Sequence, residues 1–166
     1  FRAVTERVKA ADDRVAALAG DLAPVEPVFA LRDLLSRIGS DRVECRLDGA
    51  ALPAGNRSGY VGTARIADLD RAASVLIVGG NPRTEAPVLN ARIRKAWLAG
   101  AEVALVGEPV DLTYGHAHLG TGPDALSRIA APPKEGPAVI VLCQGALARA
   151  DGAAVLGHVM ALAEKW

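Results

Sequence analysis

A continuous apolar run, a glycine turn and a second apolar run define the centre of the chain, Ser74–Pro109. Residues 75–78 are apolar without polar alternation, which is typical of a strand covered on both faces. Residues 79–82, Gly-Gly-Asn-Pro, break that strand. Residues 103–106 form the second apolar run. The pattern predicts a strand–helix–strand unit with parallel strands and a right-handed crossover.

The segment between these two strands has the periodicity of an amphipathic helix. Thr84 is expected to cap this helix, and Gly100 is expected to end it. Its apolar face is expected to consist of Leu89, Ile93, Ala96 and Trp97. The pattern therefore predicts that Trp97 is largely buried.

Strand and helix patterns also flank the central unit. Further strands are expected at residues 14–19, 43–47 and 138–142, with helices from Pro24 and from about Asp151. This order predicts an α/β fold, a doubly wound and mostly parallel five-stranded sheet with helices on both faces. Residues 1–166 are expected to form a single α/β domain. Because the first residue is Phe1 and not Met, we expect a fragment of a longer chain.

Charge and cysteine content exclude several classes of function. Nineteen basic and nineteen acidic residues cancel, so no global field favours nucleic acid or an anionic membrane surface. No apolar run approaches the roughly 20 residues that a membrane-spanning helix needs. The two cysteines, Cys45 and Cys143, are far apart in the sequence, so no cysteine-ligated iron–sulfur cluster or zinc site is expected within this segment.

Two smaller features have a structural interpretation beside a chemical one. Cys45 lies in a predicted strand, where a thiol is expected to be a small core residue. His116 and His118 could bind a metal if both rings pointed the same way along a strand. No third ligand stands out nearby, so no metal site is predicted.

Residues 48–63, from Asp48 to Thr63, are rich in Gly, Ala, Pro, Asn and Ser and show no clear period. Long loops of this kind are often functional lids, contact surfaces or mobile segments. The side chains that could hydrogen-bond a ligand or a partner are Asn56, Arg57, Ser58 and Tyr60. A solvated loop is an equally good interpretation.

A cleft is expected where the strands end, because ligands of doubly wound sheets bind beyond the carboxyl ends of the strands. The candidate turns are Gly20-Asp21, Gly79 to Arg83, Gly107-Glu108-Pro109 and Gln144-Gly145. Gly79 and Gly80 would let a ligand approach the backbone, Asn81 offers a donor and an acceptor, and Arg83 could meet a phosphate. Ordinary strand-to-helix turns would explain the same residues.

The charges at these turns oppose a pyrophosphate. Asp21 and Glu108 would repel it if they point inward, and Glu85 would compete for the positive end of the helix. Arg83 is the one well-placed candidate cation at the predicted strand ends.

Three stretches closely resemble the large iron–sulfur subunit of NADH–quinone oxidoreductase, respiratory complex I. They are L-I-V-G-G-N-P-R-T-E-A-P-V-L-N-A-R-I-R-K-A-W at 76–97, V-A-L-V-G-E-P-V-D-L-T-Y at 103–114 and H-L-G-T-G-P at 118–123. A-A-L-A-G-D-L-A-P-V-E-P-V-F-A-L-R-D-L-L near the start and A-L-A-R-A-D-G-A-A-V-L near the end look like the same family, in the same order. The resemblance covers nearly the whole chain.

The resemblance implies a fold similar to the molybdopterin oxidoreductases. In those enzymes a strand followed by G-x-N-P, and a later strand ending in Asp-Pro-Arg, help to hold a molybdopterin guanine dinucleotide. Gly79, Asn81 and Pro82 match the first motif, whereas Glu108-Pro109-Val110 replaces the second. The resemblance implies that Gly79, Gly80, Asn81 and Arg83 are a vestigial cofactor site, with no catalytic residue in the segment.

The resemblance also implies a role. We expect a structural, non-catalytic domain of that subunit, in an enzyme that passes electrons from NADH toward quinone. No cofactor is expected in this segment, and the iron–sulfur clusters would lie in a preceding part of the subunit. The expected partners are other subunits of the peripheral arm, on the cytoplasmic face of a bacterial inner membrane or the mitochondrial matrix side. The alternative is a molybdopterin-type domain that still binds a guanine dinucleotide.

Overall fold

The computed structural model describes residues 1–166 except 21, 46–48, 51 and 53–56. The chain divides into two compact units, residues 1–49 and 50–166. Each unit has its own parallel sheet. The predicted single domain over residues 1–166 stays a prediction.

The first unit is built around a short pair of parallel strands. Its elements are α1 (Arg2–Ala11), a 3₁₀ turn η1 (Asp12–Arg14), β1 (Ala17–Leu18), α2 (Val25–Arg37) and β2 (Val43–Glu44). Ala17 pairs with Val43 and Leu18 with Glu44. The predicted strands at 14–19 and 43–47 are therefore shorter in the described residues. The prediction that Cys45 is a core residue is wrong, because Cys45 is exposed.

The second unit carries the main sheet. Its elements are α3 (Ser58–Val61), η2 (Ile66–Arg71), β3 (Ser74–Val78), α4 (Pro82–Glu85), α5 (Pro87–Leu98), β4 (Glu102–Val106), β5 (Ala117–Gly120), α6 (Asp124–Ser127), β6 (Ala138–Leu142), α7 (Gln144–Leu147) and α8 (Gly152–Lys165). The four strands pair in the order β5-β4-β3-β6, and every pair is parallel.

The α/β class with parallel strands is confirmed, but the single five-stranded sheet is wrong. The structure has a four-stranded sheet in the second unit and a separate two-stranded sheet in the first. β5 was not predicted, because Ala-His-Leu-Gly is not an apolar run and is too short for an apolar–polar alternation to be recognised. Residues 117–119 of this strand are exposed.

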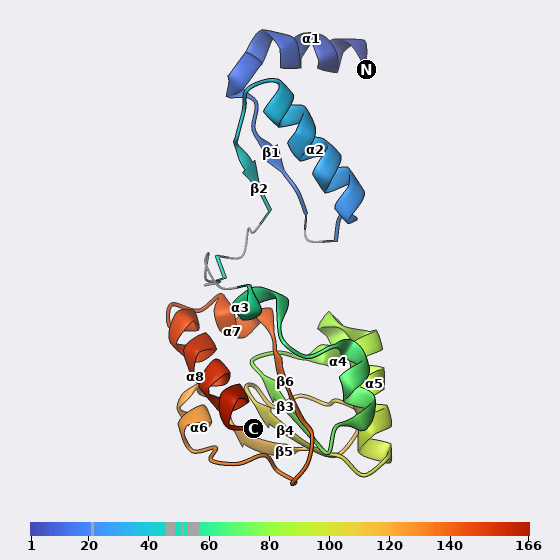
Figure 1. Ribbon diagram of the computed structural model, residues 1–166, viewed down its shortest axis with the longest axis vertical. Coiled ribbons are helices and arrows are strands. Elements are labelled where there is room, and N and C mark those ends of the chain that lie inside the picture. The colour runs from blue at the N-terminus through green and yellow to red at the C-terminus, as the bar shows by residue number, and fades with distance from the viewer. Residues whose placement is uncertain (21, 46–48, 51, 53–56) are drawn as a thin grey trace. The chain divides into compact units, whose positions relative to one another are not determined.

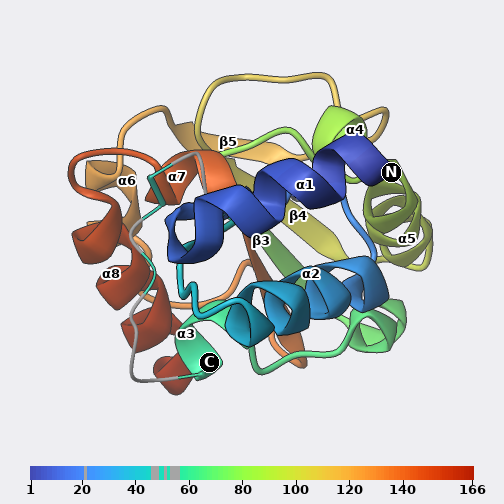
Figure 2. The same cartoon turned by 90° about the horizontal axis from the view of Figure 1, so that it is seen from above.

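Helices cover both faces of the four-stranded sheet (Figures 1 and 2). On one face, Leu69 of η2 and Ile93 of α5 pack with the strand residues Val75, Ile77, Val103 and Leu105. On the other face, α6 and α8 pack against strand residues, in a cluster that includes Leu76, Val78, Ala104, Val106, Leu126, Val155 and Val159. The full burial of β3 explains its unbroken apolar sequence.

The predicted helix after β3 is interrupted. Asn81, not Thr84, caps the short α4, and α5 begins separately at Pro87. Ala86 lies between them with φ −146° and ψ 68°, since a residue before proline avoids the helical region. The end of α5 agrees with the prediction, because Gly100 adopts φ +98° directly after the capping residue Ala99.

Trp97 is partly buried, whereas the sequence predicted a largely buried residue. Its ring lies 6.2 Å from that of Tyr114, measured between the centroids. Trp97 therefore lies at the border of the core.

Among the described residues, no helix combines the length and the apolar character needed to cross a membrane.

Candidate functional site

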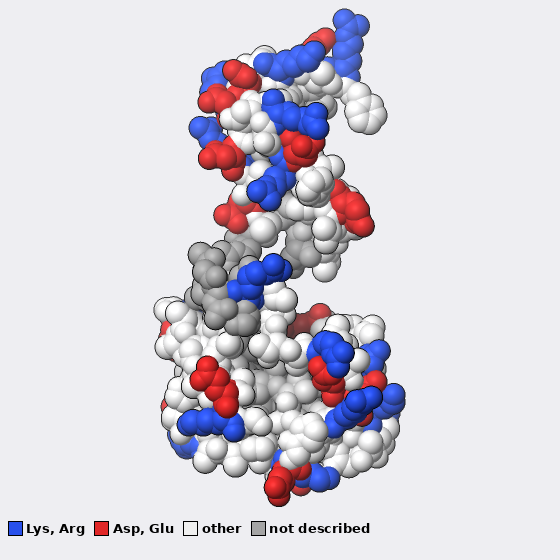
Figure 3. Space-filling view, viewed as in Figure 1, with Lys and Arg blue, Asp and Glu red and all other residues white. Residues whose placement is uncertain are grey.

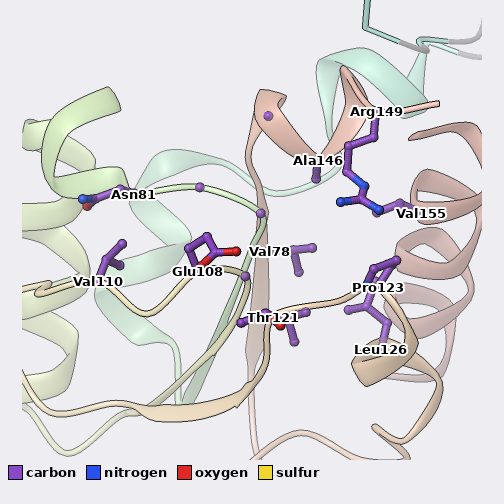
Figure 4. A pocket seen from close by; sticks show the side chains of 15 residues that line it. Val78, Asn81, Glu108, Val110, Thr121, Pro123, Leu126, Ala146, Arg149 and Val155 are labelled. Atoms are coloured by element: carbon purple, nitrogen blue, oxygen red, sulfur yellow. The ribbon is translucent and has the colours of Figure 1, made fainter. Parts of the chain in front are cut away.

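A cavity of about 320 Å³ lies where β3, β4 and β6 end. The turns after these strands contribute Gly79, Gly80 and Asn81, then Gly107 and Glu108, then Gly145. Side chains of α6 and α8, including Leu126 and Val155, form an apolar wall (Figure 4). The predicted cleft at the carboxyl edge of the sheet therefore exists in the second unit.

The glycines of the β3 turn are explained by packing within the protein. Gly79 has φ +74°, and a Cβ atom there would collide with the side chain of Ala146. A Cβ atom on Gly80 would collide with Cys143 and would lie 2.7 Å from Glu85 Oε1. Close approach of α7 and of the Cys143 side chain thus requires these glycines, whether or not a ligand binds.

Asn81 is engaged in capping α4. Its side-chain oxygen accepts a hydrogen bond from the Arg83 amide at 3.1 Å. The backbone N–H of Asn81 donates a hydrogen bond to Glu85 Oε1 at 2.6 Å. Figure 4 shows the Asn81 amide group directed away from the middle of the cavity. The Glu85 carboxylate thus occupies the backbone N–H of Asn81 that an incoming anion would need. This agrees with the prediction that Glu85 competes with an anion for the positive end of the helix.

Arg83, the cation predicted for the site, does not line the cavity in the part of the chain that the structure describes. Its guanidinium donates to the Asp111 carboxylate at 2.6 Å and to the Asp111 carbonyl oxygen at 3.2 Å. The pKa of Asp111 is lowered, chiefly by the hydrogen bond from the Thr113 amide and next by Arg83. Arg83 therefore holds the connection between β4 and β5.

Arg149 is the cavity cation that the sequence analysis missed. It lies beyond α7, and its side chain points into the cavity in Figure 4. Asp151 accepts two hydrogen bonds from it, at 2.7 and 2.9 Å, and the guanidinium lowers the pKa of Asp151. The sequence indicated a cleft turn at Gln144-Gly145, close to Arg149. It did not indicate the short helix α7, which directs the chain so that Arg149 lies at the cavity.

Glu108 points into the cavity (Figure 4), which is the orientation in which its carboxylate would repel a pyrophosphate. Among the described residues that line the cavity, the charged side chains are Glu108 and Arg149, and the Arg149 guanidinium is already paired with Asp151. A pyrophosphate would meet the Glu108 carboxylate here, while the Arg149 guanidinium is held by Asp151. These residues therefore do not fit the diphosphate of a guanine dinucleotide, although the three glycine turns leave room beside them.

Several further predicted site residues are not among those that line the cavity in the described part of the second unit. Asp21 and Asn56 lie outside the described residues, and Gly20 belongs to the first unit. Arg57 is exposed, and the backbone of Ser58 and Tyr60 lies in α3. Whether Gly79, Gly80, Asn81 and Arg83 bind a cofactor stays a prediction.

The two histidines near the site contact backbone carbonyl groups. His118 Nε2 lies 2.8 Å from the Gly107 oxygen, and His116 Nδ1 lies 3.3 Å from the Tyr114 oxygen. Within the described ranges, no three His, Cys, Asp or Glu side chains are grouped as metal ligands. The structure therefore gives these histidines a role in fixing the β4–β5 connection.

A parallel sheet with helices on both faces and a cleft at its carboxyl edge defines a doubly wound α/β domain. The whole chain, residues 1–166, matches the molybdopterin oxidoreductase family and belongs to it.

Similar proteins are found in plants, fungi and bacteria. The chain is 41% identical over 119 residues to NADH dehydrogenase [ubiquinone] iron-sulfur protein 1, mitochondrial, of Solanum tuberosum, covering 71% of this chain and 16% of that protein. It is 40% identical over 117 residues to the mitochondrial NADH-ubiquinone oxidoreductase 78 kDa subunit of Neurospora crassa, covering 68% and 16%. It is 30% identical over 176 residues to a subunit of the NADH-quinone oxidoreductase of Rickettsia bellii, covering 100% and 26%. The chain thus spans about a quarter or less of these relatives.

Proposed function

We propose that this chain is a structural, non-catalytic domain of the large iron–sulfur subunit of an NADH–quinone oxidoreductase. The whole enzyme would pass electrons from NADH toward quinone. Three relatives with names of this kind support the proposal, and one of them matches along the entire chain. Because the chain spans only part of each relative, the electron-transfer activity belongs to the proposed parent subunit.

The iron–sulfur clusters of the parent subunit would lie outside these residues, in its N-terminal part. Iron–sulfur clusters of the common types need about four cysteine thiolates, and this chain contains two cysteines in total. The domain would pack against the cluster-bearing part and against other subunits of the peripheral arm. It would lie on the cytoplasmic face of a bacterial inner membrane, or on the matrix side in mitochondria, without entering the membrane.

The observation that carries the non-catalytic assignment is the use of the cleft residues by the protein itself. Glu85 bonds the Asn81 amide, Asp111 bonds Arg83, and Asp151 bonds Arg149. Each of these three groups thus has a partner within the same unit. A bound anion would have to displace carboxylates from these positions.

The second candidate is a domain that still binds a guanine dinucleotide. It is favoured by the position of the cavity and by Gly79, Gly80 and Asn81 on its wall. A cavity of this size could hold part of such a ligand.

Calorimetry with GDP and with a pterin guanine dinucleotide separates the two candidates. We expect no measurable binding at low-millimolar ligand. A micromolar Kd that is abolished by Asn81→Ala or Arg149→Ala, but not by Arg128→Ala outside the cavity, would establish the second candidate. Arg128 is the matched control because it pairs with Asp124 as Arg149 pairs with Asp151.

The parent enzyme provides the second test. The long subunit carrying these residues, isolated with its partners, should bring NADH–quinone reductase activity with it. Arg149→Ala in that complex should leave turnover per assembled enzyme unchanged. A fall in turnover at normal assembly would show a catalytic role, and a complex without this activity would exclude the proposed parent.

A further inference from the structure

β6 has the sequence of an inner strand but lies at an edge of the sheet. Its residues are Ala-Val-Ile-Val-Leu, and the strand order β5-β4-β3-β6 leaves one side of it without a strand among the residues that the structure describes. Continuous apolar runs are typical of parallel strands with neighbours on both sides. The other edge strand, β5, contains a histidine and is exposed at residues 117–119, as is usual for an edge.

The backbone groups on the free side of β6 can be assigned from its pairing. The Cys143 amide donates to the Val78 carbonyl oxygen at 2.9 Å, so residue 143 faces β3. Because successive residues of a strand face opposite sides, Val139 and Val141 also face β3, whereas Ile140 and Leu142 direct their N–H and C=O groups to the free edge. No backbone hydrogen bond from the described residues reaches these groups at the free edge.

An apolar groove of about 430 Å³ runs along this edge. Its walls are β6, the α8 side chains Met160 and Ala163, and residues 61–66. The charged side chain on the wall, Arg65, is paired with Asp68 at 3.0 Å. A groove of this kind suits an apolar, extended polypeptide better than a charged ligand.

Trp166 provides an independent indication of a missing neighbour. It lines the same groove, and its indole N–H is buried without a hydrogen-bond partner in the described structure. A buried donor without an acceptor costs about 1–3 kcal/mol, so such groups are rare in complete folds. Because the indole nitrogen is enclosed in the present packing, a backbone carbonyl of an added segment would satisfy it after a rotation of the Trp166 ring.

The handedness of the fold determines where a further strand would go. α5 connects β3 to β4 on one face of the sheet, and α8 follows β6 on the opposite face (Figures 1 and 2). Right-handed crossovers with helices on opposite faces step in opposite directions along a sheet. A parallel strand after α8 would therefore be added outside β6.

We propose that the free edge of β6 takes a fifth parallel strand from the same polypeptide, in its continuation beyond Trp166. The inference rests on the proposed function only insofar as these residues belong to a longer subunit. The added strand bonds the backbone of Ile140 and Leu142, and its segment supplies the acceptor for Trp166.

Amide hydrogen exchange, resolved by residue, tests this edge in the 166-residue chain and in the long subunit within its complex. We expect exchange at Ile140, Leu142 and the Trp166 indole to be at least about 100-fold slower in the long subunit. Val139 and Val141, which face β3, are the internal controls and should be protected in both. Equal exchange at Ile140 and Leu142 in both proteins would overturn the inference.

The alternative occupants give different results. Protection that appears in the 166-residue chain as its concentration rises would mean a second copy at the edge. Protection that is absent from the isolated long subunit and appears on adding another subunit would mean a separate partner. Either outcome contradicts the assignment to the same polypeptide.

Two variants test the contacts separately. Ile140→Pro removes an edge-facing N–H, a change that edge strands tolerate, and should abolish the added protection at Leu142. Trp166→Phe removes only the indole N–H and should accelerate exchange at Leu142 in the long subunit but not in the 166-residue chain. No change in either variant would contradict the proposal. Quinone reductase activity of the same preparation is independent: a protected edge without activity refutes the proposed function alone.

Discussion

The two units of the chain contain the same kinds of elements but differ in how far they bury them. In the second unit, the four strands lie between two helical layers, and Val75, Leu76 and Ile77 are completely buried. In the first unit, the apolar residues buried among those described are Ala19 and Leu35, and α1 buries none. Phe29 of α2 remains 70% exposed. Equal patterning of apolar residues thus produces a core only where a sheet with both faces covered exists.

Charge does not explain the difference between the units. Figure 3 shows acidic and basic side chains interspersed over both units on the face in view. The contrast therefore comes from the number of strands and layers available for burial. A two-stranded parallel sheet with α2 packed against it, beside a helix α1 that buries no residue, has too little apolar surface to hide from water.

The largest expected effect is on independent folding. Residues 50–166 expressed alone should unfold in one cooperative thermal transition, because their sheet and both helical layers are complete enough to bury a core. Residues 1–49 alone should show no cooperative transition. Circular dichroism against temperature checks both. A sharp transition in the 1–49 fragment would mean that the first unit has a core of its own.

The next effect concerns single side chains in the two units. Ile93→Ala should lower the free energy of unfolding by about 2–5 kcal/mol, because Ile93 is fully buried in the α5 layer. Val25→Ala at the start of α2, where Val25 is 79% exposed, should change it by less than about 0.5 kcal/mol. Denaturant titrations of the full chain measure both. Leu98→Ala, at an exposed position of α5, is the control on the same helix.

A smaller loss is expected at the buried polar pair that fixes the β4–β5 connection. The Tyr114 hydroxyl donates to Asn90 Oδ1 at 2.6 Å, and Asn90 Nδ2 donates to the Leu112 carbonyl oxygen at 3.2 Å. Tyr114→Phe leaves the buried Asn90 oxygen without this donor and should cost about 1–3 kcal/mol. Thr113→Ala at the neighbouring exposed position should cost much less. Equal stability of Tyr114→Phe and wild type would show that water replaces the hydroxyl.

The central elements could be predicted because each strand is an apolar run, which a glycine ends directly in β3 and β4. β3, β4 and β6 all begin and end within about one residue of the predicted limits. The break between α4 and α5 was not predicted, although Pro87 disfavours the helical conformation of Ala86 before it. β5 escaped because its residues pack on one strand only and carry no apolar pattern.

The candidate site was predicted in part for a related reason. Gly79, Gly80 and Asn81 follow a strand directly, so local sequence was enough to place them at the cavity. Arg149 reaches the same cavity through a short helix and a turn, which no local pattern indicates. Arg83 lies just after β3, as predicted, but it does not line the cavity. Its side chain instead pairs with Asp111, 28 residues away, a contact that no local pattern indicates.

The last prediction compares the two cysteines, one in each unit. Burial raises the pKa of the Cys143 thiol to about 12, with the nearby Glu85 carboxylate adding to the shift. In the unfolded chain this thiol ionises near pH 9. The unfolded state therefore releases a proton that the folded state retains, and stability falls as pH rises from about 9 to 12. By pH 10 the loss from Cys143 should be about 1 kcal/mol.

Cys143→Ala should remove this part of the alkaline loss, so the difference in unfolding free energy between variant and wild type should shrink from pH 8 to pH 10. Cys45→Ala is the matched control, because Cys45 is the exposed cysteine of the chain. At pH 8 a thiol reagent should modify Cys45 in the folded chain and reach Cys143 only on unfolding. Rapid modification of both thiols would mean that the turn between β6 and α7 opens readily, and that the second unit is less tightly closed at its cavity than its packing indicates.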